Sequence, residues 1–383
     1  MTADRRLRIL VVTLGRRGGV TEYGWLMGRA LTRDAEVAVI HSAFADNRDK
    51  WSALDCPRLE VRTFTGIVSL LLSFLAFPRF ARIRRFAHEF RPDVVYYPGG
   101  HVWKPLLDLL LPRSAATVLT VHDPHLHPGE DSLAWRLLGW ANRRRVTGYV
   151  LLNRSHQAGF LARFGLDPER VIVIPHGVFD DYSSSPGEAP DVTALTGIGP
   201  SDVGRYMLFV GRIRPYKGVD TLLEAYGMLA PDEAGPLVLA GSGDLSDVEN
   251  ERLRTLEGRP VYFVNAWLSD SEIAALVSAA RFVVLPYRSA TQTGVVPLAS
   301  AFGVPAIASA TGGLVEQVVD GRTGLLFPPG DAKALRGLLA EAYAIGEEDY
   351  RRMSRQCREH AFTNWGWEGL SSRLARFCES LSA

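Results

Sequence analysis

The sequence is poor in cysteine and has no excess of charge of either sign. Its 383 residues include three cysteines, and 43 lysines and arginines balance 42 aspartates and glutamates. Cys56, Cys357 and Cys378 lie far apart, so they form no metal-site spacing and suit a reducing cytoplasm. A net charge of +1 argues against a general nucleic-acid binder, which needs a marked basic excess. We therefore expect a cytoplasmic protein whose partners include no nucleic acid.

Long apolar runs are also absent. The most apolar stretch, GIVSLLLSFLAF at residues 66–77, is shorter than the roughly 20 residues that a membrane-spanning helix needs. It leads into a basic segment that contains Arg82, Arg84 and Arg85. The pattern is typical of a core helix followed by an amphipathic surface helix. The alternative is a helix on anionic lipid, with the protein peripheral to the inner face of the membrane.

Several catalytic signatures are missing as well. The chain has no P-loop, no nucleophile elbow and no complete dinucleotide fingerprint, so hydride chemistry loses its main support. No Asp-x-Asp pair is present to chelate a metal–diphosphate. His122, His125 and His127 share one segment, but no clustered carboxylate or thiolate completes a set of metal ligands. We expect no metal and no bound cofactor.

The sequence does contain short runs of Val, Ile and Leu that alternate with helical patterns. The runs are nearly free of charge, as strands of a parallel sheet are when helices cover both faces. Residues 180–202 are rich in Ser, Pro and Gly and interrupt this alternation as a linker would. The pattern predicts an α/β protein with two Rossmann-like, doubly wound domains, residues 1–185 and 200–363, facing a central cleft.

A glycine-flanked basic loop opens the second half. In FVGRIRPYKGVDTLLEAY, Gly211, Arg212 and Lys217 follow a predicted strand, and a helix is expected to begin near Val219. Two cations at a strand end can neutralise a diphosphate, with Arg212 binding it bidentately and Lys217 acting as a point charge. The alternative is a solvated turn that happens to be basic.

An uncharged loop and short helix follow Arg288 in RSATQTGVVPLASAFGVPAIAS. We expect the helix to begin near Val296 or Pro297, so that free backbone N–H groups stabilise an anion without a charged side chain. The loop residues that would approach the anion are Thr291, Gln292, Thr293, Gly294 and Val295.

Three further loops carry candidate ligand contacts. Gly241 ends a predicted strand, either as a tight turn or as a base-binding loop, and Glu316 stands on a later strand-to-helix turn. In the first half, Gly18 and Gly19 would let a ligand reach a helix start. His122 directly follows an apolar strand, and its alternative interpretation is a hydrogen-bonded structural histidine.

Together these motifs resemble the retaining glycosyltransferases of family GT4, which have the GT-B fold. The resemblance covers nearly the whole chain and is most specific in FVGRIRPYKGVDTLLEAY, AGSGDL, AFGVPAIASATGGLVEQVVDGRTGLLFPPGD and NWGWEGL. It implies a nucleotide-diphosphate sugar bound mainly by the second domain, with Arg212 and Lys217 on the diphosphate and Gly18–Gly19 approaching it. It also implies that His122 contacts the sugar and that a final helix, residues 364–383, crosses back to the first domain.

One departure from the family concerns a pair of glutamates. The family carries them with seven residues between them across this loop and helix, whereas alignment places Ala290 and Leu298 there. Thr291, Gln292 and Thr293 would then make the sugar contacts, and Glu316 or a backbone group would bind the ribose.

The resemblance implies transfer of a hexosyl group with retention and without a metal. The acceptor is a glycan, a lipid-linked saccharide or a small-molecule aglycone, and Trp103 and Trp135 would suit a soluble one. The alternatives are a catalytically silent sugar-nucleotide-binding protein of the same fold and an enzyme that transfers glucosyl units without a nucleotide. The latter is disfavoured because no glycine-flanked lysine resembles a pyridoxal anchor.

Overall fold

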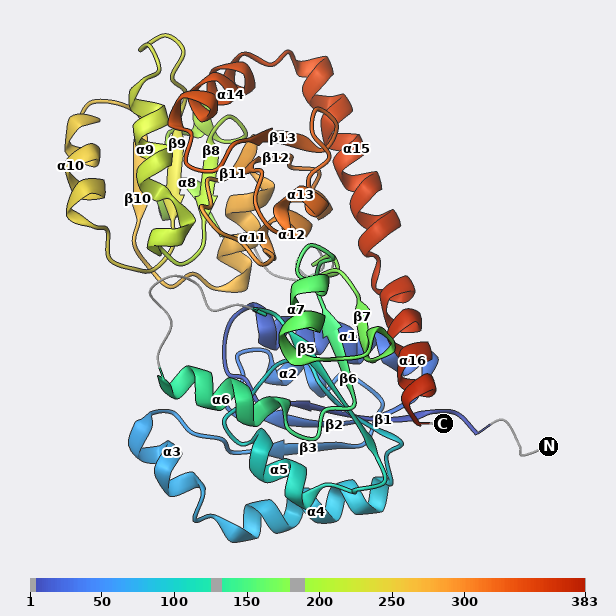
Figure 1. Ribbon diagram of the computed structural model, residues 1–383. Coiled ribbons are helices and arrows are strands. Elements are labelled where there is room, and N and C mark those ends of the chain that lie inside the picture. Colours follow the sequence, from blue (N-terminus) through green and yellow to red (C-terminus); the bar gives the residue numbers. More distant parts are fainter. Residues whose placement is uncertain (1–4, 125–132, 180–189, 383) are drawn as a thin grey trace. The chain divides into compact units, whose positions relative to one another are not determined.

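The computed structural model describes residues 5–124, 133–179 and 190–382. The chain divides into two compact units, residues 1–177 with 367–383 and residues 178–366 (Figure 1). The sequence predicts a first domain of residues 1–185, a second of residues 200–363, and a helix at residues 364–383 that crosses back to the first. Within the second unit, Val178 donates its backbone N–H to the carbonyl of Trp365, 3.0 Å away.

The first unit contains a seven-stranded sheet in which all strands are parallel, in the order β3-β2-β1-β4-β5-β6-β7. The strands are β1 (Arg8–Thr13), β2 (Glu36–Ser42), β3 (Arg58–Val61), β4 (Val94–Tyr97), β5 (Ala116–Val121), β6 (Gly148–Leu151) and β7 (Val171–Val173). Its helices are α1 (Gly19–Asp34), α2 (Arg48–Trp51), α3 (Ile67–Ser73), α4 (Phe77–Phe90), α5 (Lys104–Leu110), α6 (Leu133–Arg143), α7 (Gln157–Phe164) and α16 (Trp367–Ser382).

Apart from the edge strand β3, the strands of this sheet are mostly apolar because both of their faces are buried. Leu10 and Val12 of β1 join a core with Phe80 of α4 on one face, while Ile9 and Val11 lie fully buried on the other. Successive residues of a strand point to opposite faces, so a strand covered on both sides shows no alternation with polar residues. The predicted parallel, helix-covered sheet is confirmed.

The second unit contains a six-stranded parallel sheet in the order β10-β9-β8-β11-β12-β13. The strands are β8 (Met207–Val210), β9 (Leu237–Ala240), β10 (Val261–Val264), β11 (Phe282–Leu285), β12 (Ala306–Ser309) and β13 (Gly324–Phe327). The helices are α8 (Val192–Thr196), α9 (Val219–Gly227), α10 (Asp247–Thr255), α11 (Asp270–Ser278), α12 (Val295–Ala301), α13 (Leu314–Gln317), α14 (Ala332–Ala344) and α15 (Glu347–Trp365).

The last helix, α16, belongs to the first unit although it follows the second in sequence. It packs beside α1, and the hydroxyls of Ser371 and Ser372 donate to the two carboxylate oxygens of Asp34 at 2.6 and 2.7 Å. Gly177 faces the ring of Trp367 so closely that a Cβ there would lie 2.4 Å from it. These contacts fix both the start and the middle of α16 on the first unit.

The expectation of a core helix within residues 66–77 is wrong. Helix α3, the following turn and the first residue of α4 leave most of their large apolar side chains in solvent, including Ile67 at 80% and Phe77 at 73% exposure. Leu70 and Ser73 face the core instead. The expected amphipathic helix is present as α4, whose Phe80, Ile83, Ala87 and Phe90 are buried. Figure 1 shows α3 at the periphery of the first unit.

Candidate functional site

Both sheets have a point where the strand order reverses direction. In the first sheet it lies between β1 and β4, and in the second between β8 and β11. Loops that leave the carboxyl ends of such neighbouring strands diverge and leave room for a ligand. Gly18 and Gly19 follow β1, Arg212 and Lys217 follow β8, and Thr291 follows β11. The sequence motifs therefore map onto the two switch points.

Glycines let the loops after β8, β9 and β11 approach one another through their backbones. A Cβ on Gly241 would lie 2.0 Å from the carbonyl oxygen of Gly211, and a Cβ on Gly218 would lie 2.0 Å from that of Pro286. Gly211 and Gly241 have φ values of 126° and 149°, which only glycine adopts readily. Any side chain at Gly241 or Gly218 would force the loops apart.

Arg288 joins the loop after β11 to the loop after β8. Its guanidinium pairs with the carboxylate of Asp220 in the first turn of α9, and its backbone N–H donates to the carbonyl of Tyr216 at 2.7 Å. This arginine, the last charged residue before the uncharged loop, thus has a structural role. It holds the two candidate ligand-binding loops of the second unit together.

Arg212 and Lys217 carry positive charges that no carboxylate of the described residues neutralises. Arg212 is exposed, while Lys217 is partly buried and its Nζ lies 5.1 Å from the ring centroid of Tyr287. A Cβ on Gly211 would lie 2.8 Å from that Nζ, so a side chain there would displace the ammonium. Two uncompensated cations at a switch point attract an anion.

The hydroxyl of Tyr287 and Oε1 of Gln292 are buried and have no hydrogen-bond partner among the described residues. Buried polar atoms are almost always hydrogen-bonded, so such exceptions tend to mark places where a ligand or water supplies the partner. Tyr287 itself is 3% exposed. Both groups lie on the segment that joins β11 to α12.

The loop before α12 is held by Gln317 at the end of α13. The side-chain amide of Gln317 donates to the carbonyl of Thr293 at 2.9 Å and accepts its N–H at 3.4 Å. The helix begins at Val295, and the N–H of Val295 is already bound by the Thr293 hydroxyl at 3.1 Å. Pro297 has no N–H, so fewer free donors face outward than the sequence indicated.

The glutamate positions of the family are apolar and buried here. Ala290 and Leu298 are 4% and 5% exposed, so neither presents a polar group. Glu316, the suggested substitute, lies on the exposed side of α13, whereas its neighbour Gln317 reaches the loop. The sequence reasoning missed Gln317, since nothing in the sequence pairs it with a backbone 24 residues away.

In the first unit, the start of α1 is open. Gly18 has φ 82° and ψ −178°, a conformation restricted to glycine, and no side chain caps the helix. A Cβ on Gly18 or Gly19 would meet no atom within 4 Å. The two glycines therefore border free space at the N-terminus of a 16-residue helix, where N–H groups and the helix dipole favour an anion.

His122 follows β5 and contacts the loop after β4. Its Nε2 lies 2.7 Å from the carbonyl oxygen of Pro98, and its ring meets that of Tyr23 edge-on at 5.0 Å. A carbonyl only accepts, so Nε2 carries the proton. Burial lowers the pKa of His122, which keeps the ring neutral and leaves Nδ1 as an acceptor.

The structure adds residues around His122 that the sequence reasoning did not single out. Tyr23 lies between His122 and His176, and Trp367 from α16 completes the cluster. Burial lowers the pKa of His176 to about 4, so it is also neutral near pH 7. Residues 173–178, VIPHGV, contained the signal for His176, because they place a histidine three residues after the end of β7.

Trp103 is buried rather than offered to a soluble acceptor. It is 0% exposed, and its indole N–H donates to the hydroxyl of Ser73 at 3.0 Å. Its backbone N–H donates to Nδ1 of His101 at 3.1 Å, and burial lowers the pKa of His101 to about 4. Its ring is part of the core between α3, α4 and α5.

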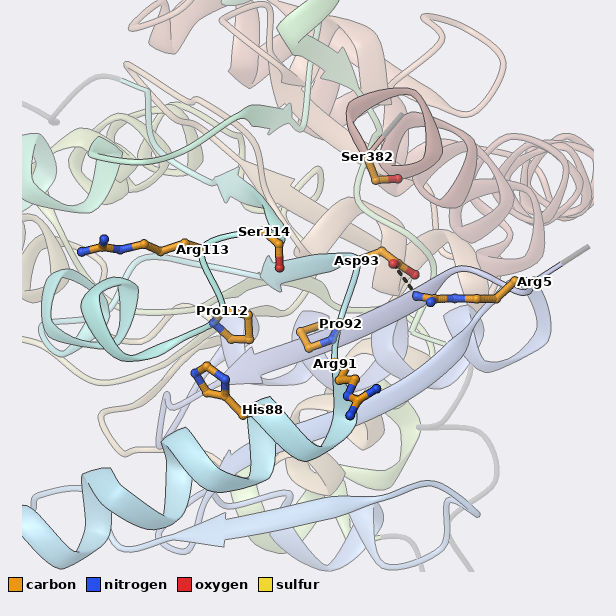
Figure 2. Close-up of a pocket in the computed structure, with 9 residues that line it drawn as sticks. All are labelled: Arg5, His88, Arg91, Pro92, Asp93, Pro112, Arg113, Ser114 and Ser382. Atoms are coloured by element: carbon orange, nitrogen blue, oxygen red, sulfur yellow. Dashed lines mark hydrogen bonds and ion pairs between the residues drawn. The ribbon is translucent and has the colours of Figure 1, made fainter. Parts of the chain in front are cut away.

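A surface pocket of about 450 Å³ lies at the opposite edge of the first sheet (Figure 2). It is lined by residues before β1, β4 and β5, among them Arg5, His88, Arg113 and Asp93, and Asp93 pairs with Arg5 at 2.6 Å. Ligands of such sheets bind at the carboxyl ends of strands. This pocket is therefore separate from the candidate site.

Within the described residues, no three His, Cys, Asp or Glu side chains gather as metal ligands would. His125 and His127 lie outside these residues. In the same part of the chain, no helix is long and apolar enough to cross a membrane.

Comparison with known proteins agrees with this geometry. Residues 198–360 match the family model of glycosyl transferases group 1, and residues 17–182 match that of glycosyltransferase family 4. D-inositol 3-phosphate glycosyltransferase 2 of Catenulispora acidiphila is 32% identical over 73% of this chain and 68% of its own length. The D-inositol 3-phosphate glycosyltransferase of Segniliparus rotundus is 28% identical over 73% of this chain and 63% of its own length.

A solved structure, Anabaena Alr3699/HepE in complex with UDP and glucose, has a TM-score of 0.73. The match is 20% identical and covers 98% of this chain and 100% of that one. It shows a common GT-B fold. The two sheets have their candidate loops at the switch points, both family models match, and one relative exceeds 30% identity. The chain therefore belongs to the family 4 glycosyltransferases.

Proposed function

We propose that this protein transfers a sugar from a nucleotide-diphosphate sugar to an acceptor hydroxyl, with retention of configuration and without a metal. The observation that carries the proposal is the pair of cations, Arg212 and Lys217, without a neutralising carboxylate at the β8–β11 switch point. A diphosphate is the anion that suits them, because Arg can bind two oxygens and Lys adds a point charge.

The leaving diphosphate would be stabilised electrostatically by these two side chains. The C1–O bond to the diphosphate breaks with oxocarbenium character, and a bond forms from C1 to the acceptor oxygen on the same face. The acceptor proton passes to an oxygen of the leaving phosphate. His122 would accept a hydrogen bond from a sugar hydroxyl through Nδ1, since its neutral Nε2–H is directed at Pro98.

The donor site would be completed by the loops around these cations. Gly211 and Gly241 let the backbones after β8 and β9 approach closely, and Thr291 and Gln292 directly follow Ala290, which stands where the family has its first glutamate. Gly18 and Gly19 remain candidates for a donor contact at the N-terminus of α1. Gly294, Val295 and Glu316 remain candidates for phosphate or ribose contacts.

The test is a thermal-shift screen with UDP, GDP, ADP, dTDP and CDP, with and without magnesium. We expect one nucleotide to raise the melting temperature equally in both conditions and Arg212→Ala to abolish the effect. Arg214→Ala is the matched control, because Arg214 is an exposed cation of the same loop. A shift that needs magnesium would contradict metal independence. No shift with any nucleotide would contradict the donor site.

Retention is tested by the slow hydrolysis of the donor identified in that screen. Proton NMR of the first sugar released should show the anomer of the donor, because water then replaces the acceptor. Release of the opposite anomer would overturn the same-face mechanism.

A catalytically silent sugar-nucleotide-binding protein is the second candidate. The buried Ala290 and Leu298 favour it, because a donor site without the glutamate pair loses two polar contacts. Binding of a nucleotide sugar without transfer or hydrolysis would distinguish this candidate from the enzyme. We place the protein in the cytoplasm, as its three unpaired cysteines suit a reducing compartment.

A further inference from the structure

Helix α3, the turn that follows it and the first residue of α4 expose a continuous apolar segment. Six large apolar side chains between residues 67 and 77 are each at least 60% exposed: Ile67, Val68, Leu71, Leu72, Leu75 and Phe77. We call these six residues the α3 surface. Single exposed apolar residues are normal, but a group of this size within eleven residues marks an interaction site.

The orientation of α3 is fixed by its polar residues. At its start, the hydroxyl of Ser69 accepts the backbone N–H groups of Thr65 and Gly66, both at 2.9 Å. At its end, the hydroxyl of Ser73 accepts the indole N–H of Trp103 at 3.0 Å. Leu70 packs against the core between these anchors. The helix is thus held by one face, and the α3 surface is the face left over.

The neighbouring helix adds positive charge without acidic residues to balance it. Arg82, Arg84 and Arg85 are exposed on α4, and no carboxylate of the described residues pairs with them. Between Val61 and His88 the sequence contains no aspartate or glutamate. The apolar segment is therefore bordered by a cationic one, which suits a partner that is apolar inside and anionic at its edge.

We propose that α3 and α4 bind the surface of an anionic lipid bilayer. The α3 surface would enter the boundary between headgroups and acyl chains, and Arg82, Arg84 and Arg85 would lie against anionic headgroups. A second copy of this chain is a poorer occupant, because contact through the same surface would bring the two arginine clusters together. A seven-residue helix cannot span the bilayer, so the binding is peripheral.

This surface is connected to the carboxyl edge of the first sheet. Trp103, which holds Ser73, also donates its backbone N–H to Nδ1 of His101 in the loop after β4. That loop lies at the switch point of the sheet. The next step alone rests on the proposed function. If the protein is a transferase, its acceptor is anchored in the membrane, as a lipid-linked saccharide or a glycolipid is, and is not a soluble aglycone.

The experiment is co-sedimentation of the full chain with vesicles of phosphatidylcholine, with and without phosphatidylglycerol. We expect binding to the anionic vesicles only, and weakening by added salt. Arg82→Gln/Arg84→Gln/Arg85→Gln should weaken binding by on the order of a hundredfold, as each arginine contributes about fivefold near an anionic surface. Leu71→Ser/Leu75→Ser should weaken it by at least about tenfold while leaving the melting temperature unchanged.

Val248→Ser/Val315→Ser is the matched control, because these two residues are exposed and apolar but lie on the second unit, on α10 and α13. Equal binding of wild type and the α3 variant, or no binding of the wild type, would overturn the proposal. Sedimentation velocity without lipid tests whether a second copy of the chain binds the α3 surface instead. A dimer that Leu71→Ser/Leu75→Ser dissociates would assign the surface to that second copy. None of these readouts involves a nucleotide, so failure here leaves the proposed transferase activity untouched.

Discussion

Gln317 binds both backbone groups of Thr293. Its side-chain nitrogen donates to the Thr293 carbonyl at 2.9 Å, and its oxygen accepts the Thr293 N–H at 3.4 Å. Gln317 is 8% exposed and Thr293 6%, so water cannot easily replace either bond. One side chain thereby sets the path of the loop that carries Thr291 and Gln292.

Replacing Gln317 with leucine removes both bonds while keeping the volume nearly the same. We expect the free energy of unfolding to fall by about 1–3 kcal/mol, because two buried backbone groups lose their partners. Affinity for the nucleotide sugar should fall as well, since the loop is no longer held. Urea unfolding and calorimetric titration measure the two effects. Val315→Ala, on the exposed side of the same helix, should change neither, and an unchanged affinity in Gln317→Leu would contradict the positioning role.

Tyr287→Phe should change stability and ligand binding in opposite directions. The Tyr287 hydroxyl is buried without a partner among the described residues, a state that costs about 1–3 kcal/mol, so its removal should raise the melting temperature of the free protein. If the donor supplies the missing partner, the same substitution should weaken nucleotide-sugar binding roughly tenfold. Tyr287→Leu should weaken it further, because it also removes the ring near Lys217. A lower melting temperature for Tyr287→Phe would show that the hydroxyl is structural.

The sheets and the positions of the motifs could be predicted because they depend on local patterns. Uncharged runs identified the parallel strands other than the edge strand β3, which contains Arg58 and Glu60. Helix α9 begins at Val219, as its preceding glycine loop predicted. Each of these signals lies within a few residues of the feature that it predicts.

What failed depends on contacts between distant segments. The sequence of α3 is as apolar as that of a buried helix, and contacts such as the hydrogen bond from Trp103 to Ser73 and the packing of Leu70 on the core decide which face is left in solvent. Gln317 is next to Glu316, which the family resemblance suggested. Neighbouring residues of a helix face different directions, and in α13 it is Gln317 that faces Thr293. No local pattern encodes such a choice.

Acid should weaken the first unit between about pH 6.5 and pH 4. Burial lowers the pKa values of His101 and His176 from 6.5 to about 4, so in this range the unfolded chain binds protons that the folded chain does not. Their stabilising effect is complete above pH 6.5 and is lost as the pH falls towards 4, by on the order of 3 kcal/mol for each group. Urea unfolding across this range measures the slope.

The slope is that of the unfolding free energy against pH, and it reports the protons taken up on unfolding. The variant His176→Gln should reduce this uptake by up to one proton, whatever its effect on stability at neutral pH. His88→Gln is the control, because it replaces a histidine that is exposed on α4. A slope that is identical in His176→Gln and wild type would show that His176 does not titrate with unfolding.

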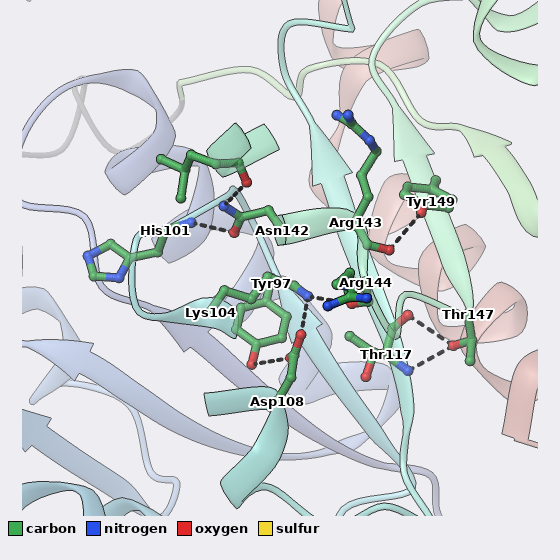
Figure 3. Close-up of polar contacts among 11 residues, drawn as sticks. Tyr97, His101, Lys104, Asp108, Thr117, Asn142, Arg143, Arg144, Thr147 and Tyr149 are labelled. Atoms are coloured by element: carbon green, nitrogen blue, oxygen red, sulfur yellow. Dashed lines mark hydrogen bonds and ion pairs between the residues drawn. The ribbon is translucent and has the colours of Figure 1, made fainter. Parts of the chain in front are cut away.

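The buried pair of Lys104 and Asp108 supports the same unit (Figure 3). Their side chains lie 2.8 Å apart at 0% and 5% exposure, and the hydroxyl of Tyr97 donates to the other oxygen of Asp108 at 3.2 Å. Burial lowers the pKa of Lys104, and the charge of Asp108 opposes that shift. Asp108→Asn keeps an acceptor for Tyr97 but leaves the ammonium uncompensated, so we expect a loss of about 3–5 kcal/mol near neutral pH.

The double variant Lys104→Met/Asp108→Asn should recover most of that loss, because it removes the uncompensated charge and retains the bond from Tyr97. In Asp108→Asn alone the loss should shrink as the pH rises towards the ordinary lysine pKa, since the neutral amine then costs less to bury. Urea unfolding of the three proteins between neutral and alkaline pH measures both effects. A pH-independent loss, or a double variant no more stable than Asp108→Asn, would assign the cost to packing rather than to the buried charge.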